Sequence, residues 1–160
     1  GSCRQVDLGA GARALRVAAS SSSTCAVLDT GRVKCWGLNT FGNLGQGDRT
    51  PRPSAGDDLP PVDLGANSSA LDVACGYEHC CALLVSGAVK CWGQNLVGQC
   101  GQSELRIGVG AEPGDMGDAL PALDVGGPAT AVAAGRLHSC ALRADGRVLC
   151  WGYNSHGQLG

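Results

Sequence analysis

The amino-acid sequence predicts an all-β fold built from three tandem repeats. Three segments, 17–45, 73–101 and 132–160, align with one another without a gap over 29 residues. Each segment holds two short apolar runs joined by a three-residue turn that ends in glycine, which is typical of a β-hairpin. No helical periodicity is sustained over a long window. Self-similarity at this period predicts a solenoid, a propeller or another array of stacked β-units.

Each repeat begins with a short lead-in, and linkers of a different composition separate the repeats. The lead-in reads VDLG at 6–9 and at 62–65, and LDVG at 123–126. The linkers, 46–61 and 102–122, are rich in Pro, Gly and Asp, so we expect surface loops. The organisation that follows is one domain in three parts: repeat 1 with its linker (1–61), repeat 2 with its linker (62–122) and an incomplete repeat 3 (123–160).

The hairpin of the middle repeat predicts the pairing of its two strands. Residues 81–84 and 88–91 face each other across the turn 85–87, whose last residue is a glycine that can adopt positive φ. This register places Cys81 opposite Cys91. Directly opposed side chains lie close enough for a disulfide bond.

The same spacing recurs in the other two repeats. It pairs Cys25 with Cys35 and Cys140 with Cys150. Each bridge would contribute about 2–3 kcal/mol if it is unstrained. Because side chains alternate along a strand, Leu83 and Val89 share a face with the middle bridge, and we expect that face to pack on a neighbouring repeat.

Four further cysteines lie outside this pattern: Cys3, Cys75, Cys80 and Cys100. They allow three pairings. Cys75 and Cys100 both replace apolar residues of the other repeats, so we expect a Cys75–Cys100 bridge. Cys3 and Cys80 could pair with each other or with another chain, or remain free thiols. Ten cysteines, most of them at a repeating spacing, indicate disulfides made in an oxidising compartment.

Metal and catalytic chemistry are weakly supported by the sequence. Paired thiols with His79 or His138 nearby resemble a zinc site superficially, but there is no C-x-x-C, so we expect no metal. Either histidine could be a general base, yet a partly buried histidine hydrogen-bonded within its own repeat is the interpretation we favour. No nucleophile with a consistent His and Asp partner can be assembled. We therefore expect neither an enzyme nor a cofactor.

The charge pattern gives no reason to expect nucleic acid or an anionic membrane as partner. The formal net charge is −2, and Lys and Arg are scattered singly. No run of 18 apolar residues exists, so we expect no direct membrane insertion. The sequence Asn67-Ser68-Ser69 is an N-glycosylation acceptor motif, and we expect a glycan on Asn67 if the chain follows a secretory route.

The third repeat carries a motif that identifies a family resemblance. Residues 132–160 contain every position of V-A-x-G-x-x-H-x-C-A-L-x-x-x-G-x-V-x-C-W-G-x-N-x-x-G-Q-L-G, which resembles the regulator-of-chromosome-condensation (RCC1-like) repeat family. The resemblance implies a β-propeller with one four-stranded blade per repeat and seven blades in the closed ring. It thus implies about three blades, a partial ring. The added hairpin cysteines resemble a secreted or cell-surface branch of this superfamily.

Three functions are compatible with this resemblance. We favour an extracellular or cell-surface scaffold for protein interactions, a repeat module of a larger surface or filamentous assembly. A ligand- or protein-binding propeller, as in an inhibitor or a receptor ectodomain, is the alternative, and a guanine-nucleotide exchange factor is the least favoured. Three repeats cannot close a ring of seven, so we expect a longer precursor whose further repeats complete the propeller, or other protein chains that complete it in a homo- or hetero-assembly.

Overall fold

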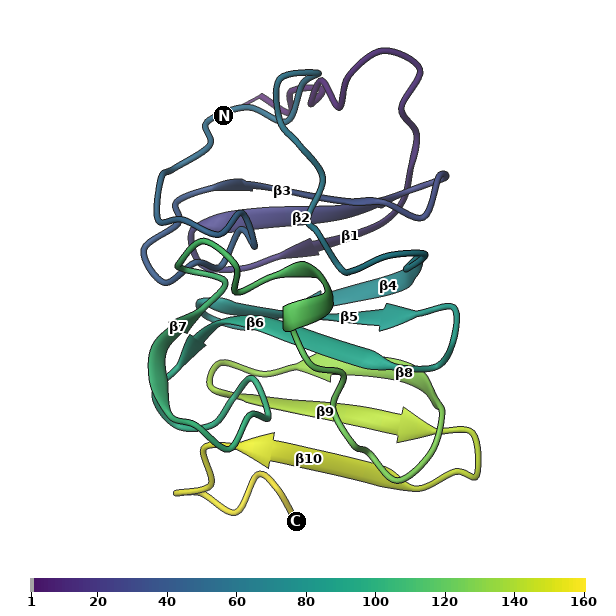
Figure 1. The fold of residues 1–160 in the computed structure, drawn as a ribbon, viewed down its shortest axis with the longest axis vertical. Helices are drawn as coiled ribbons and strands as arrows, with labels where there is room; N and C mark the ends of the chain where they lie inside the picture. The colour runs from purple at the N-terminus through teal and green to yellow at the C-terminus, as the bar shows by residue number, and fades with distance from the viewer. Residues whose placement is uncertain (1) are drawn as a thin grey trace.

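The computed structural model describes residues 2–160 as three antiparallel β-sheets stacked side by side (Figure 1). We call each sheet a blade. Blade 1 contains β1 (Ala14–Ala19), β2 (Ser23–Leu28) and β3 (Val33–Gly37). Blade 2 contains β4 (Ala70–Cys75), β5 (His79–Leu84), β6 (Val89–Asn95) and β7 (Arg106–Val109). Blade 3 contains β8 (Ala129–Ala134), β9 (His138–Arg143) and β10 (Val148–Gly152). The all-β prediction is confirmed.

Helical structure is confined, within residues 2–160, to the single 3-10 turn η1 (Gly117–Ala119) in the second linker. No helix in this part of the chain reaches the length and apolarity needed to cross a membrane.

The expectation of four strands per blade is met in blade 2 alone. There, β7 pairs with β6 through Gly93 and Val109. At the corresponding place in blade 1 the linker makes a single bridge, between Gly37 and Arg52. Arg52 stands between Pro51 and Pro53, and proline has no N–H to donate to a strand ladder. The sequence of this linker therefore limits the fourth strand to one residue pair, while the described part of blade 3 shows three strands.

The hairpin register agrees with the sequence prediction. Cys81 pairs with Cys91 and Leu83 with Val89, and the other two blades repeat this register. The turn glycine of blade 2, Gly87, has a φ of 81°, in the left-handed region that disfavours side chains. A Cβ atom added there would lie 2.7 Å from Cβ of Pro128, directly before β8 of blade 3. The glycine is thus required both for the turn and for the close approach of blade 3.

Replacing Gly87 with alanine is expected to destabilise the protein by about 1–2 kcal/mol from the backbone alone, and by more because of the contact with Pro128. Gly146→Ala is the matched control, since Gly146 has a φ of 84° at the equivalent turn but no atom within 4 Å of the added Cβ. Thermal unfolding of the two variants should give a larger decrease in Tm for Gly87→Ala. Equal decreases would show that the approach of Pro128 costs nothing.

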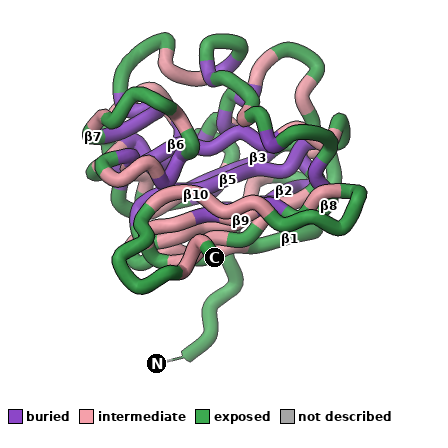
Figure 2. The backbone as a smooth tube through the Cα atoms, turned by 90° about the horizontal axis from the view of Figure 1, so that it is seen from below, coloured by how far each residue is buried: buried purple, intermediate pink, exposed green. Residues whose placement is uncertain are grey.

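One apolar core runs through the three blades rather than three separate cores. Its members come from every blade and from the second linker, as Leu44, Trp92 and Leu120 illustrate, each at most 1% exposed. Blade 2 lies between the other two, and all six residues of β5 are buried. Figure 2 shows buried residues concentrated on β5, β6 and β3, while β1 and the N-terminal segment are exposed. The blades therefore stabilise one another through their faces.

Candidate interaction site

The contacts between blades use the same repeat positions at both interfaces. The indole N–H of Trp92 donates a hydrogen bond to the carbonyl of Asn43 in the preceding blade, and the indole of Trp151 donates to the carbonyl of Gln99, each at 3.0 Å. A backbone hydrogen bond from the amide of Tyr77 to the carbonyl of Arg136 (3.0 Å) joins the turns of blades 2 and 3. Because these contacts repeat, each blade presents donors and acceptors for the next one.

His79 is part of the interface between blades 2 and 3. The Ser139 hydroxyl donates to the carbonyl of Gln99 (2.9 Å) and so accepts a hydrogen bond from Nε2 of His79 (2.8 Å). The histidine has no exposed surface, and among the described residues its Nδ1 has no partner. Burial, together with the charge of nearby His138, lowers the pKa of His79 from 6.5 to about 4. His79 is therefore neutral at physiological pH and is enclosed by protein, and its bond crosses to blade 3 instead of staying within its own repeat as we expected.

Two buried lysines tie the lead-ins to the linkers, a role that our sequence predictions do not include. Nζ of Lys90 donates to the carbonyls of Leu64 (2.8 Å) and Gly117 (3.0 Å). Lys34 makes the equivalent contacts in blade 1, and Leu149 occupies this position in blade 3. The recurring motif V-K-C-W indicates this role, because a lysine between two core residues on a buried strand must find oxygen atoms that accept its hydrogen bonds.

The far face of blade 3 exposes residues that the other blades bury. Leu142 is 39% and Val148 65% exposed, whereas their equivalents in blade 2, Leu83 and Val89, are 3% and 0% exposed. We call Leu142, Val148 and the adjoining Cys140–Cys150 bridge the open face of blade 3. Our expectation that such a face packs on a neighbouring repeat is confirmed for blade 2.

Blade 1 has a corresponding open side at Trp36. Trp36 occupies the position of Trp92 but is only partly buried, and its indole N–H finds no acceptor within residues 2–160. Since Trp92 and Trp151 each bond to the blade before them, Trp36 marks where a preceding blade would lie. The two ends of the stack are thus complementary. Blade 1 offers an indole N–H donor, and blade 3 offers an apolar face. Blade 3 also has a loop at Gln158 that is equivalent to the loops in which Asn43 and Gln99 accept the indole hydrogen bonds.

Four disulfide bonds are present in the structure. Three join the hairpin pairs expected from the register: Cys25–Cys35, Cys81–Cys91 and Cys140–Cys150, with Cα atoms 4.0–4.1 Å apart. The fourth is Cys75–Cys80. The free cysteines are Cys3, which is exposed, and Cys100, which is buried.

The predicted Cys75–Cys100 bridge is wrong. Cys75 ends β4 directly opposite Cys80 on β5, so a short turn brings these two sulfurs together. Cys100 lies instead in the loop after β6, where its amide donates to Oδ1 of Asn95 (2.9 Å) and its thiol approaches the carbonyl of Gln94 (3.3 Å). Burial raises the pKa of the Cys100 thiol, which keeps it protonated and unreactive. The count of residues that predicts the hairpin bridges, applied across residues 76–79, predicts the correct pair.

The glycosylation motif lies in an accessible loop. Asn67 is exposed, with a φ of 58°, between the lead-in and β4 of blade 2. Asparagine tolerates this left-handed conformation better than most residues. The position can accept a modification without burial, and glycosylation itself stays a prediction.

Removing the buried Cys81–Cys91 bridge by a double substitution to alanine is expected to cost about 2–3 kcal/mol, because it releases a hairpin loop in the unfolded chain. The matched control is the same double substitution at Cys140 and Cys150, which are only half-buried on the open face of blade 3. Urea unfolding should show the larger loss for Cys81 and Cys91, since cavities in the core add to the loss of the bridge. A larger loss at Cys140 and Cys150 would contradict the difference in burial.

Comparison with known proteins agrees with this geometry. The family model described as the regulator of chromosome condensation (RCC1) repeat matches residues 15–43, 71–102 and 129–158, and a second model of the same repeat matches residues 30–83. The chain belongs to the RCC1 repeat family. Each match to the first model spans most of one blade, so the family's repeat and the structural repeat coincide.

Longer proteins contain the same RCC1 arrangement. The chain is 34% identical to the ultraviolet-B receptor UVR8 of Arabidopsis thaliana over 153 residues, which is 94% of this chain and 32% of UVR8. It superposes on human WBSCR16 with a TM-score of 0.74 at 22% identity, covering 90% of this chain and 34% of WBSCR16. The superposition on Prp20p of Saccharomyces cerevisiae has a TM-score of 0.70 at 24% identity, covering 94% and 33% of the two chains. The chain thus spans about a third of each of these relatives.

Proposed function

We propose that this chain is a protein-interaction scaffold of the RCC1 repeat family, without catalytic activity, whose two open ends receive further blades of the same kind. One observation carries the proposal: Leu142 and Val148 are exposed in blade 3, while the equivalent residues of blade 2 are buried by the next blade. Apolar surface of this kind is costly in water unless another surface covers it. An RCC1-type blade fits this surface, because both interfaces in the structure already contain a hydrogen bond from the tryptophan of one blade to a loop carbonyl of the preceding blade.

Relatives support a binding role. The crystal structure of Prp20p was described together with its binding properties to Gsp1p and histones, which are both proteins. The chain's own histidine at the second interface is buried and neutral, which favours a structural use of His79 over a catalytic one.

We further propose that the scaffold is located outside the cell or on its surface, as part of a larger assembly. Eight of the ten cysteines are bonded in the structure, and three of the four bridges recur at one position in every repeat. Bridges of this kind persist in oxidising compartments and are rare where glutathione keeps thiols reduced. The exposed Asn67 motif suits the same secretory route.

Self-association of the purified chain tests the interaction proposal. Analytical ultracentrifugation should show concentration-dependent association that Val148→Glu abolishes, because a charge on the open face of blade 3 would be buried by a docking blade. Val85→Glu is the matched control, since Val85 is equally exposed but lies at the hairpin turn of blade 2. A chain that stays monomeric at every concentration, or a Val148→Glu variant that associates normally, would refute the proposed open face.

The proposed location has a separate test. Protein recovered from its natural source and unfolded in the presence of an alkylating agent should show label on Cys3 and Cys100 only. Alkylation of the six hairpin cysteines in that protein would refute the extracellular placement while leaving the self-association result unaffected.

A further inference from the structure

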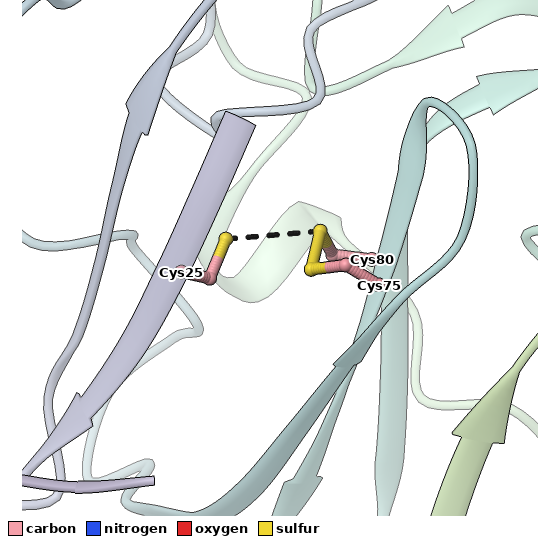
Figure 3. Close-up of side chains that lie close together, drawn as sticks. All are labelled: Cys25, Cys75 and Cys80. Carbon is pink, nitrogen blue, oxygen red and sulfur yellow. Dashed lines mark hydrogen bonds between the residues drawn. A yellow bond between two sulfur atoms is a disulfide. The ribbon is translucent and has the colours of Figure 1, made fainter. Parts of the chain in front are cut away.

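Four sulfur atoms from two blades meet at the interface of blades 1 and 2. The Cys25–Cys35 bridge belongs to blade 1 and the Cys75–Cys80 bridge to blade 2. Sγ of Cys25 lies 3.7 Å from Sγ of Cys80, and the sulfurs of Cys25, Cys75 and Cys80 all lie within 4.8 Å of one another (Figure 3). Because these sulfurs are bonded in disulfides, none of them carries a proton, and the approach is a van der Waals contact between two bridges.

In blades 2 and 3 the repeat places one residue against the bridge of the blade before it. Cys80 occupies this position in blade 2, and Ser139 occupies it in blade 3, where its Oγ lies 3.6 Å from Sγ of Cys81. Blade 1 has Thr24 there. Among the three repeats, blade 2 alone therefore sets a sulfur against the bridge of its neighbour.

The four sulfurs differ in their access to solvent. Cys25, Cys35 and Cys80 have no exposed surface, whereas Cys75 is partly exposed at the end of β4. A thiolate from solution therefore reaches Cys75 first. Attack on Sγ of Cys75 forms a mixed disulfide there, breaks the Cys75–Cys80 bond and leaves Cys80 as a buried thiolate beside Cys25.

We propose that this cluster is a thiol-driven switch that replaces two bridges within blades by one bridge between them, Cys25–Cys80. The Cys80 thiolate attacks Sγ of Cys25, the Cys25–Cys35 bond breaks, and Cys35 leaves with the electron pair and takes up a proton. A second small thiol then attacks the mixed disulfide and releases Cys75. In sum, two protein disulfides and two small monothiols yield one protein disulfide, two protein thiols and one small-molecule disulfide.

The new bridge links parts of the chain that are far apart in the sequence. Cys25 and Cys80 are 55 residues apart, against separations of 10 and 5 for the two original bridges. A crosslink across a longer loop removes more conformational entropy from the unfolded chain. A mildly reducing thiol would thus crosslink blade 1 to blade 2 instead of releasing them.

Peptide mapping tests the switch directly. The folded protein is incubated with reduced glutathione, quenched with acid and N-ethylmaleimide, and digested with trypsin and an endoprotease specific for glutamate. A Cys25–Cys80 bridge joins peptide 17–32 to peptide 79–90, which the original pairing does not. We expect this linked species to increase at least tenfold over untreated protein. Cys80→Ser, which copies Ser139, is the matched control and should never give it.

A second variant removes the need for glutathione. Cys75→Ala restores the alanine that the other repeats have as Ala19 and Ala134, so the fold should be retained. It leaves Cys80 as a thiol beside the Cys25–Cys35 bridge, and the linked peptides should form spontaneously and increase with pH as the thiolate forms. The proposal fails if glutathione frees Cys75 and Cys80 while Cys25–Cys35 stays intact. It fails equally if Cys75→Ala keeps only Cys25–Cys35 at every pH.

Discussion

Replacing Trp92 with alanine is expected to destabilise the protein by about 3–5 kcal/mol, the range found for truncating a fully buried aromatic side chain. Trp92 has no exposed surface and lies in the core between blades 1 and 2. Its loss leaves a cavity, and it also leaves the carbonyl of Asn43 without its donor at 3.0 Å. Both effects act at the interface, so the blades should separate more easily. Urea unfolding followed by far-ultraviolet circular dichroism measures the change.

Trp36→Ala is the matched control, because Trp36 holds the same repeat position on the open side of blade 1. Its side chain is partly exposed and donates no hydrogen bond within the described residues. The loss of stability should therefore be much smaller. Equal losses for the two variants would mean that Trp92 acts within its own blade, and the interface between blades 1 and 2 would not depend on it.

Local features of the fold could be predicted from the sequence, and contacts between repeats could not. The register of Cys81 with Cys91 follows from counting residues across a glycine turn, and the structure has this register. The hydrogen bond from His79 to Ser139 depends on how one sheet twists onto the next, a geometry that residue spacing does not contain. For the same reason, residue spacing does not predict the hydrogen bond that the Trp92 indole donates to blade 1.

The wrong bridge has a different physical origin. The prediction of a Cys75–Cys100 bridge rests on the replacement of apolar residues by both cysteines, but a shared substitution pattern does not bring two sulfurs within bonding distance. The position of Cys100 in the loop after β6 satisfies its thiol with the carbonyl of Gln94. Local strand pairing of Cys75 with Cys80 was the stronger argument, as it was for the hairpins.

Acid is expected to weaken the fold through His79. The histidine has a pKa of about 4 when folded and an ordinary value of 6.5, so between these values the unfolded chain binds a proton that the folded chain does not. Its contribution is complete above pH 6.5 and decreases as the pH falls toward 4. A difference of about 2.5 pKa units corresponds to a loss of about 3 kcal/mol at the lower end of this window. Urea unfolding at a series of pH values from 7 to 4 measures it.

The variant His79→Ser isolates this effect, since repeat 1 has Ser23 at the equivalent position. The variant should be less stable at pH 7, because it leaves a cavity beside Ser139, yet it should lose less of its remaining stability between pH 6.5 and 4. Although burial opposes it, hydrogen bonds from Arg106 and from the amide of Glu112 hold the pKa of Asp115 below its ordinary value of 3.8. Asp115 therefore takes up its proton below pH 4, outside the range in which His79 titrates. If both proteins lost stability in parallel, His79 would not be the buried neutral group at the interface of blades 2 and 3.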